Sequence, residues 1–308
     1  MNRGVLLLAL GDPGYGRMAF NLAVNLRLAS PNLSIALGHC EDALNDLTEF
    51  HKSFFSEIFE IPKEMYVYFH KKSSLNDFFA GKYTEAKITG RVNIDNRKDY
   101  FKAKTHLYEL SPFDQTMFID VDTLWQKPIE PIFNALEAVG FAMNNREFYD
   151  LRNYEAIKDT AGHWARVRSY VECFGMKPHW VEMSSFFIYF QKNAQNKAFF
   201  EKVKANSENT HPAHPANVSI YKNGMRPDEP FFSSAAYEMQ YYPMGMPFKP
   251  VYMYIHAGWD TDDYYALTFS GYPGDGGADL YQTRMREIYK QAKLPINEKF
   301  MILPTFRT

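Results

Sequence analysis

The residues best suited to chemistry are two aspartates, Asp120 and Asp122, which follow a short apolar run at residues 116–119. An apolar run of this length, bounded by polar residues, predicts a buried strand. Ligands of open α/β sheets bind beyond the carboxyl ends of strands. Two carboxylates spaced by one residue at such an end can both reach one hard divalent cation, which prefers oxygen ligands. The same pair would also suit a turn or a helix cap, so the rest of the chain must decide.

Composition narrows the class of protein. The chain has 308 residues, of which 46% are hydrophobic and 23% charged, with a net charge of −2, and this predicts a globular protein with a large core. The charge gives no electrostatic case for nucleic acid as the main partner. Two cysteines are too few for a disulfide framework. No apolar run is long enough for a signal-peptide core or a transmembrane segment, so we expect a soluble, cytoplasmic protein.

Strands and helices alternate in the first part of the chain, which predicts a parallel α/β sheet there. The later elements include a helix at residues 99–110 that leads into the strand before Asp120. We detect no internal repeat or linker, and we predict one domain at residues 1–265 with a C-terminal helical extension at residues 266–308. The expected strands are residues 5–10, 33–37, 65–69, 116–119, 141–143, 185–190 and 252–256, and the expected helices are residues 17–28, 41–52, 99–110, 132–139, 193–205, 227–238 and 279–292.

A longer pattern surrounds the two aspartates. A lysine at the expected helix (Phe-Lys-Ala-Lys, residues 101–104) is followed by Ser-Pro-Phe-Asp (111–114) and by Phe-Ile-Asp-Val-Asp-Thr-Leu (118–124). The segment Pro-Ile-Glu-Pro-Ile-Phe comes next, at residues 128–133. In this order the chain resembles the retaining, nucleotide-sugar-dependent glycosyltransferases of the GT-A fold, specifically glycosyltransferase family 8 and the glycogenin-like group. The resemblance covers residues 4–258 and is strongest over residues 104–133.

The resemblance implies a Rossmann-like central sheet, mixed but mainly parallel and flanked by helices, and a retaining transfer of a hexose from a UDP-sugar. Asp120 and Asp122 would hold Mn²⁺ or Mg²⁺, which neutralises the charge that grows on the departing diphosphate. His256 is the implied third metal ligand, since imidazole together with carboxylates suits Mn²⁺. The lysine that often follows this histidine in the family is replaced here by Trp259-Asp260.

The resemblance also implies a set of donor contacts. Tyr15 would stack on uracil, and glycine after the first strand lets the backbone approach closely. Lys104 would contact the donor, although its position also fits a surface lysine whose stem packs on the helix. The predicted donor-binding residues are Leu10, Gly11, Tyr15, Lys104, Asp120, Val121, Asp122, Ser184 and Gly258.

Two later segments depart from the family pattern. Met183-Ser184-Ser185 stands where the family has Asn-Ser-Gly, and Asp228-Glu229 stands where it has Asp-Gln. The resemblance places Asp228 against the donor sugar or the acceptor, whereas its position before Glu-Pro suits a helix N-cap equally well. Lys104 and Asp228 are the predicted catalytic residues.

Other functions remain open at this point. A degenerate nucleotide-sugar-binding protein would explain the departures from the family pattern. A phosphatase of the haloacid dehalogenase class also has a strand ending in Asp-x-Asp and uses the first aspartate as nucleophile. That motif expects Thr or Val four residues after the first aspartate, where this chain has Leu124. The expected partners are a nucleotide-sugar donor and a sugar, lipid or protein acceptor, with residues 146–178 as a candidate acceptor surface.

Overall fold

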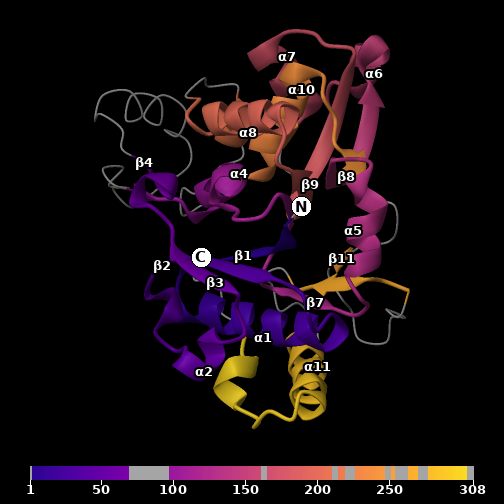
Figure 1. Ribbon diagram of the computed structural model, residues 1–308. Coiled ribbons are helices and arrows are strands. Elements are labelled where there is room, and N and C mark those ends of the chain that lie inside the picture. The colour runs from indigo at the N-terminus through magenta and orange to yellow at the C-terminus, as the bar shows by residue number, and fades with distance from the viewer. Residues whose placement is uncertain are drawn as a thin grey trace.

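The computed structural model describes residues 2–68, 97–160, 165–209, 214–218, 226–246, 251–253, 263–269 and 277–303, and the statements below concern these residues. A seven-stranded sheet lies at the centre, in the order β10-β8-β9-β6-β1-β2-β3 (Figure 1). Neighbouring strands are parallel except at β9, which runs antiparallel to both β6 and β8. The predicted fold class, a mixed and mainly parallel α/β sheet flanked by helices, is confirmed.

The remaining strands form two small sheets, one in the order β11-β12-β7 and one that pairs β4 with β5. The strands are β1 (Arg3–Gly11), β2 (Ile35–Glu41), β3 (Glu57–Glu60), β4 (Val67–Tyr68), β5 (Arg97–Lys98), β6 (Gln115–Ile119), β7 (Thr123–Trp125), β8 (Phe141–Asp150), β9 (His179–Gln191), β10 (Met244–Gly245), β11 (Val251–Met253) and β12 (Ala266–Thr268). The α-helices are α1 (Pro13–Ala29), α2 (Glu49–Lys52), α4 (Leu107–Leu110), α5 (Glu130–Glu137), α6 (Tyr154–Ile157), α7 (Val167–Phe174), α8 (Ala194–Ser207), α9 (Pro215–Val218), α10 (Glu229–Met239) and α11 (Gly277–Gln291). The 3₁₀ helices are η1 (Asp42–Leu44), η2 (Lys63–Met65), η3 (Tyr100–His106), η4 (Leu151–Asn153) and η5 (Glu298–Met301).

The central sheet is buried on both faces. Along β1, Val5 and Leu7 contribute to the core that includes α1 and α11, whereas Leu6 and Leu8 contribute to the core that includes α8 and α10. Alternate side chains of a strand point to opposite faces of its sheet. A strand covered on both faces therefore has a continuous apolar sequence, and the run at residues 5–10 has this property. Figure 1 shows α1 and α11 on one side of the sheet and α8 and α10 on the other.

The C-terminal part of the chain returns to the first helix. Asn21 of α1 donates a hydrogen bond to the Tyr281 hydroxyl (2.9 Å) and accepts one from the Tyr289 hydroxyl (2.8 Å), and both tyrosines lie on α11. The strand β12 pairs with β7, immediately after Asp122. The proposed boundary between residues 265 and 266 stays a prediction.

Three expected elements differ from the structure. Residues 99–110 are mostly the 3₁₀ helix η3, followed by the single turn α4. 3₁₀ turns are frequent at the start of an α-helix, and the pattern of apolar residues does not reveal them. The expected helix at 41–52 is wrong, because η1 and α2 are separated by a turn. The third parallel strand is β3, while residues 67–68 pair with β5 outside the central sheet.

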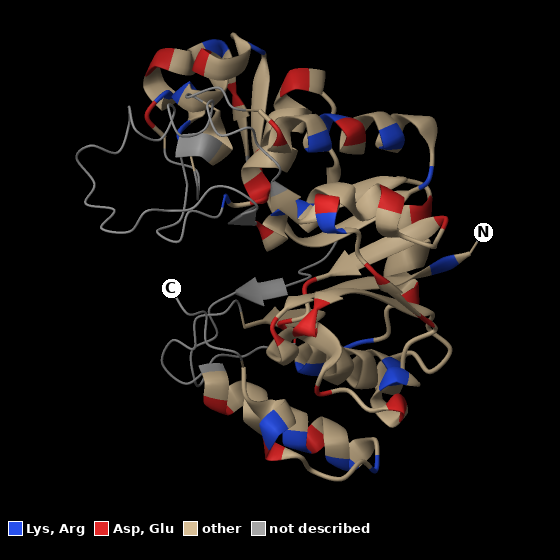
Figure 2. Cartoon of the chain, turned by 90° about the vertical axis from the view of Figure 1, so that its left-hand side faces the viewer, with Lys and Arg blue, Asp and Glu red and all other residues tan. Residues whose placement is uncertain are grey.

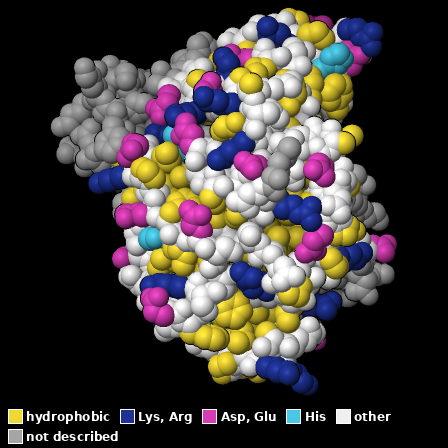
Figure 3. Space-filling view, viewed as in Figure 1, with side chains coloured by type: hydrophobic (Ala, Val, Ile, Leu, Met, Phe, Trp, Pro, Cys, Tyr) yellow, Lys and Arg dark blue, Asp and Glu magenta, His cyan; other side chains and the backbone are white. Residues whose placement is uncertain are grey.

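The outer surface carries both signs of charge. Acidic and basic residues are interspersed along the helices (Figure 2), and the face seen in Figure 3 mixes both with apolar side chains. This distribution fits the net charge of −2. Within the described residues, no helix combines the length and apolar character needed to cross a membrane.

Gly16 sets the contact between α1 and η1. A Cβ atom at Gly16 would lie 1.9 Å from the carbonyl oxygen of Ala43, which is backbone and cannot move aside cheaply. We expect Gly16→Ala to lower the free energy of unfolding by about 1–3 kcal/mol, measured by urea denaturation. In a helix without this contact the same change stabilises by about 1 kcal/mol. A stabilised variant would therefore contradict the close approach.

Candidate functional site

The predicted aspartates lie at the carboxyl edge of the central sheet. β6 ends at Ile119, so Asp120 follows it directly, and the neighbouring parallel strands β1 and β2 end at Gly11 and Glu41. Gly11 and Glu41 are register partners. Open α/β sheets bind their ligands at this edge. The strand order β6-β1-β2 therefore brings three chain segments to one candidate site.

Lys104 joins two of the predicted residues. Its Nζ atom lies 2.8 Å from Oδ2 of Asp120 and 3.3 Å from Oδ2 of Asp228. The residue is only 8% exposed, so the alternative of a surface lysine is wrong. The ammonium also lies 5.5 Å from the centre of the Phe118 ring, close enough for a cation–π contact.

Asp228 occupies the N-cap position of α10, but its side chain makes no capping hydrogen bond. Instead its carboxylate pairs with Lys104 and accepts a short hydrogen bond from the Ser185 hydroxyl. The next residue, Glu229, accepts a hydrogen bond of 2.8 Å from the Ser184 hydroxyl. Two consecutive serines of β9 thus bind the two consecutive carboxylates at the start of α10.

An irregularity in β9 explains how both serines reach α10. Consecutive residues of a regular strand face opposite sides of its sheet. The pairing of β9 with β8 shifts between Met143, opposite Ile188, and Asn144, opposite Ser184. Bulges of this kind change the direction in which side chains point and occur next to active sites. Ser185 and Glu229 were not predicted as site residues, although each is adjacent in sequence to a residue that was.

The backbone around Asp122 is held by other strands. Asp120 N donates to the Phe186 carbonyl of β9 (3.1 Å), and the Asp122 carbonyl accepts from Phe269 N (2.8 Å), which follows β12. The Asp122 carboxylate accepts from the Thr268 hydroxyl at 3.2 Å. Val121, between the two aspartates, is buried. β9 and the end of β12 therefore hold the Asp-x-Asp segment from two sides.

Tyr15 and the end of β1 lie at the same edge. Burial raises the pKa of the Tyr15 hydroxyl above its usual range, and the charges of Asp122, Asp12 and Asp120 add to this effect. Tyr15 is therefore near the two predicted metal ligands. Gly11 has φ of +79°, and a Cβ atom there would lie 2.6 Å from the Tyr100 hydroxyl, so the position requires glycine. Leu10, before it, is half-buried.

Negative charge is in excess at this edge. Burial lowers the pKa of Lys104, but the charges of Asp120 and Asp228 outweigh it and raise the pKa above the usual range, so the lysine is cationic. Burial raises the pKa of Asp120; Lys104 opposes this shift, while the like charges of Asp122 and Asp228 add to it. Lys104 is one positive charge beside the three carboxyl groups of Asp120, Asp122 and Asp228. A hard divalent cation would compensate the negative charge that remains.

The donor atoms present fit such a cation only in part. Asp120 and Asp122 supply carboxylate oxygens, which suit Mg²⁺ or Mn²⁺. Among the residues that the structure describes, no group of three His, Cys, Asp or Glu side chains is gathered to hold a metal ion. The predicted third ligand, His256, and the predicted donor contact Gly258 lie outside the described residues.

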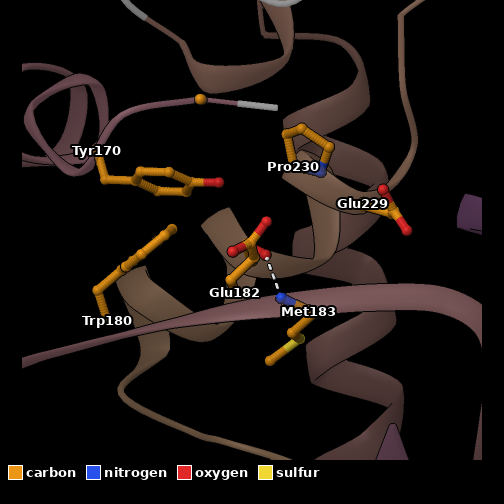
Figure 4. Close-up of a pocket in the computed structure, with 8 residues that line it drawn as sticks. Tyr170, Trp180, Glu182, Met183, Glu229 and Pro230 are labelled. Atoms are coloured by element: carbon orange, nitrogen blue, oxygen red, sulfur yellow. Dashed lines mark hydrogen bonds between the residues drawn. The ribbon is translucent and has the colours of Figure 1, made fainter. Parts of the chain in front are cut away.

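A small pocket adjoins the Glu229 carboxylate at the start of α10. In Figure 4, Tyr170 and Trp180 lie on one side of it and Glu229 and Pro230 on the other. The Met183 amide, at its floor, donates to the Ser233 hydroxyl at 3.0 Å. The pocket has a volume of about 10 Å³, room for one water molecule at most. It shares Glu229 with the site but is too small for a nucleotide.

The hydrogen bond from Ser185 to Asp228 is expected to stabilise the fold. Both residues are buried, so Ser185→Ala removes a hydrogen-bond donor from the buried Asp228 carboxylate. We expect the free energy of unfolding to fall by about 1–3 kcal/mol, measured by urea denaturation. Ser234→Ala on α10 is the matched control, because Ser234 Oγ is equally buried and has no hydrogen-bond partner among the described residues. Equal effects of the two substitutions would contradict the role of the Ser185–Asp228 bond.

No family model and no curated protein matches the sequence. The solved apo structure of the bifunctional glycosyltransferase WbbM matches with a TM-score of 0.52 at 12% identity, covering 94% of this chain and 52% of the WbbM chain. The chain has a GT-A glycosyltransferase fold.

Two further solved structures match over most of their length. The galactosyltransferase LgtC, in complex with donor and acceptor sugar analogs, matches with a TM-score of 0.49 at 13% identity, covering 96% of this chain and 98% of that chain. Mouse xyloside xylosyltransferase 1, in its apo form, matches with a TM-score of 0.44 at 10% identity, covering 83% of this chain and 88% of that chain.

Proposed function

We propose that the protein is a metal-dependent, retaining glycosyltransferase that moves a hexose from a UDP-sugar to a hydroxyl group of a sugar, lipid or protein acceptor. The observation that supports this most is the ion pair of Lys104 with both Asp120 and Asp228 at the carboxyl edge of the sheet. It joins the Asp-x-Asp strand end to the start of α10 in a fold that a known glycosyltransferase also has.

Each proposed role follows from the charge and place of the side chain. Asp120 and Asp122, with His256 as the proposed third ligand, would hold Mn²⁺ or Mg²⁺, which supplies Lewis-acid stabilisation of the departing diphosphate. Lys104 adds a fixed positive charge where the diphosphate carries negative charge. Asp228, oriented by Lys104 and Ser185, would accept a hydrogen bond from a hydroxyl of the donor sugar or the acceptor.

The donor nucleotide is proposed to lie along the ends of β6 and β1. Tyr15 would stack on the uracil ring, and the backbone at Leu10 and Gly11 would approach the nucleoside. The proposed remaining contacts are Val121, Ser184 and Gly258. No side-chain nucleophile is required for retention if the acceptor attacks from the face that the diphosphate leaves, with the leaving phosphate taking the acceptor's proton.

The test uses the 308-residue chain. It is incubated with UDP-glucose, UDP-galactose and their N-acetyl analogues, with Mn²⁺ or with EDTA, and UDP release and ligand-induced thermal shifts are measured. We expect a thermal shift and UDP release that both require the metal. Binding without turnover across a broad acceptor panel would indicate a degenerate binding protein. Absence of metal-dependent binding of every sugar nucleotide would overturn the proposal, and phosphate release from a monoester that is lost in Asp120→Asn would indicate a phosphatase.

A further inference from the structure

Glu41, the last residue of β2, has a backbone conformation that favours glycine. Its φ is +54° and its ψ is −130°, and in this region the Cβ of an ordinary residue clashes with its own backbone. Residues held in such conformations cluster at active sites and ligand-binding positions. The Glu41 side chain is exposed, so packing in the core does not account for a residue other than glycine at this position.

The position of Glu41 connects it with the proposed donor site. It is the register partner of Gly11 on β1, and β1 lies between β2 and β6. Adjacent strands are about 4.8 Å apart, so the edge from Asp120 to Glu41 spans about 10 Å. β1 and β2 lie side by side in Figure 1. A nucleoside diphosphate can extend along such an edge, with its diphosphate at Asp120 and its nucleoside at Glu41.

Tyr100 orients the Glu41 carboxylate. The Tyr100 hydroxyl donates to Glu41 Oε2 at 2.8 Å. The Tyr100 ring stacks on Tyr66, with 6.0 Å between centroids, and its hydroxyl fills the space beside Gly11. Burial raises the pKa of Tyr100, as do its hydrogen bond to Glu41 and the Glu41 charge, so Tyr100 remains a donor. This hydrogen bond fixes the position of the Glu41 carboxylate relative to Gly11.

We propose that Glu41 accepts a hydrogen bond from a ribose hydroxyl of the nucleotide donor and that Tyr100 is its positioning residue. The inference rests on the proposed function. A diphosphate would be repelled by the carboxylate, whereas the ribose diol supplies the donors that a carboxylate binds. In dinucleotide-binding βαβ units a carboxylate that follows the first glycine-rich turn makes this contact. The site would then distinguish ribonucleotides from deoxyribonucleotides.

The experiment measures the affinities of UDP, 2′-deoxy-UDP and 3′-deoxy-UDP by calorimetry in the presence of Mn²⁺. Wild type is expected to prefer UDP over at least one deoxy analogue by about tenfold, the effect of one charge-assisted hydrogen bond. Glu41→Gly should bring that ratio close to one, and Tyr100→Phe should lower it part of the way. Glu60→Gln is the control, since Glu60 is an exposed glutamate at the end of the next parallel strand, β3, and should keep the full ratio.

Thermal unfolding of the same variants provides a second readout. Glycine relieves the strain at φ +54°, so Glu41→Gly should raise the unfolding midpoint while it removes the ribose preference. A lowered midpoint with an unchanged ratio would mean that Glu41 is structural and would overturn the inference. If wild type binds UDP with Mn²⁺ but binds both deoxy analogues equally well, the inference also fails and the proposed function stands. If wild type binds no UDP, the proposed function itself fails.

Discussion

Asp122→Asn is expected to lower metal-dependent UDP release by about 10²–10³-fold, the range found when one group that stabilises developing charge is removed. Asparagine keeps the size of the side chain and an oxygen that can accept from the Thr268 hydroxyl, but it removes the negative charge proposed to bind the metal. The measurement is the initial rate of UDP release at increasing Mn²⁺ concentrations. The Mn²⁺ concentration at half-maximal rate should rise together with the loss of rate.

A matched control lies just before the start of the same strand. Asp114 is exposed, precedes β6 and accepts a hydrogen bond from Asn2 N at 3.0 Å, so Asp114→Asn makes the same chemical change away from the carboxyl edge. It should leave the metal dependence of the rate unchanged. If Asp122→Asn also kept the wild-type dependence on Mn²⁺, the proposed metal site would be wrong.

Lys104→Met is expected to lower the free energy of unfolding by about 3–5 kcal/mol, the cost of removing one partner of a buried ion pair. Methionine is apolar and unbranched and fits the space of the lysine stem, so the loss reports the charge. Asp120 and Asp228 would be left facing each other without a cation. The measurement is urea denaturation at pH 7, together with the rate of UDP release, which should also fall.

A second substitution separates electrostatics from packing. Adding Asp228→Asn to Lys104→Met removes one of the repelling charges and should restore part of the lost stability. Lys202→Met is the control, because Lys202 pairs with Glu238 at 3.3 Å with its side chain 38% exposed, and such pairs contribute about 1 kcal/mol or less. If Lys104→Met were no more destabilising than Lys202→Met, the ion pairs of Lys104 with Asp120 and Asp228 would not be what stabilises this part of the protein.

Much of the fold follows from local sequence patterns. β1 and β6 are apolar runs buried on both faces, and they were predicted because burial of this kind leaves a continuous signal. β3 was missed because its four residues, Glu-Ile-Phe-Glu, are half polar and short. η3 was predicted as part of an α-helix because the apolar positions of residues 99–110 are spaced three and four residues apart. A 3₁₀ stretch at the start of an α-helix is common and leaves no separate signal in such a pattern.

The sequence predicts several individual residues of the candidate site. It does not predict which of them contact one another. The sequence indicates Lys104, Asp120 and Asp228 separately. Their meeting depends on β9 and α10, which begin at His179 and Glu229, far along the chain from Asp120. The partnership of Ser184 and Ser185 with Glu229 and Asp228 depends on a shift in strand pairing. No local pattern encodes a register shift, because it results from how two distant strands pack.

The pairing of β7 with β12 has a consequence for the order in which the protein is assembled. Thr268 and Phe269, which bond to Asp122, are separated from it in sequence by more than 140 residues. During synthesis the Asp-x-Asp segment leaves the ribosome long before the strand that fixes it. Contacts this distant in sequence form late and slow folding. A nascent chain with most of its sheet already formed would thus still lack a fixed Asp122, and the proposed activity would begin only once the C-terminal residues had docked.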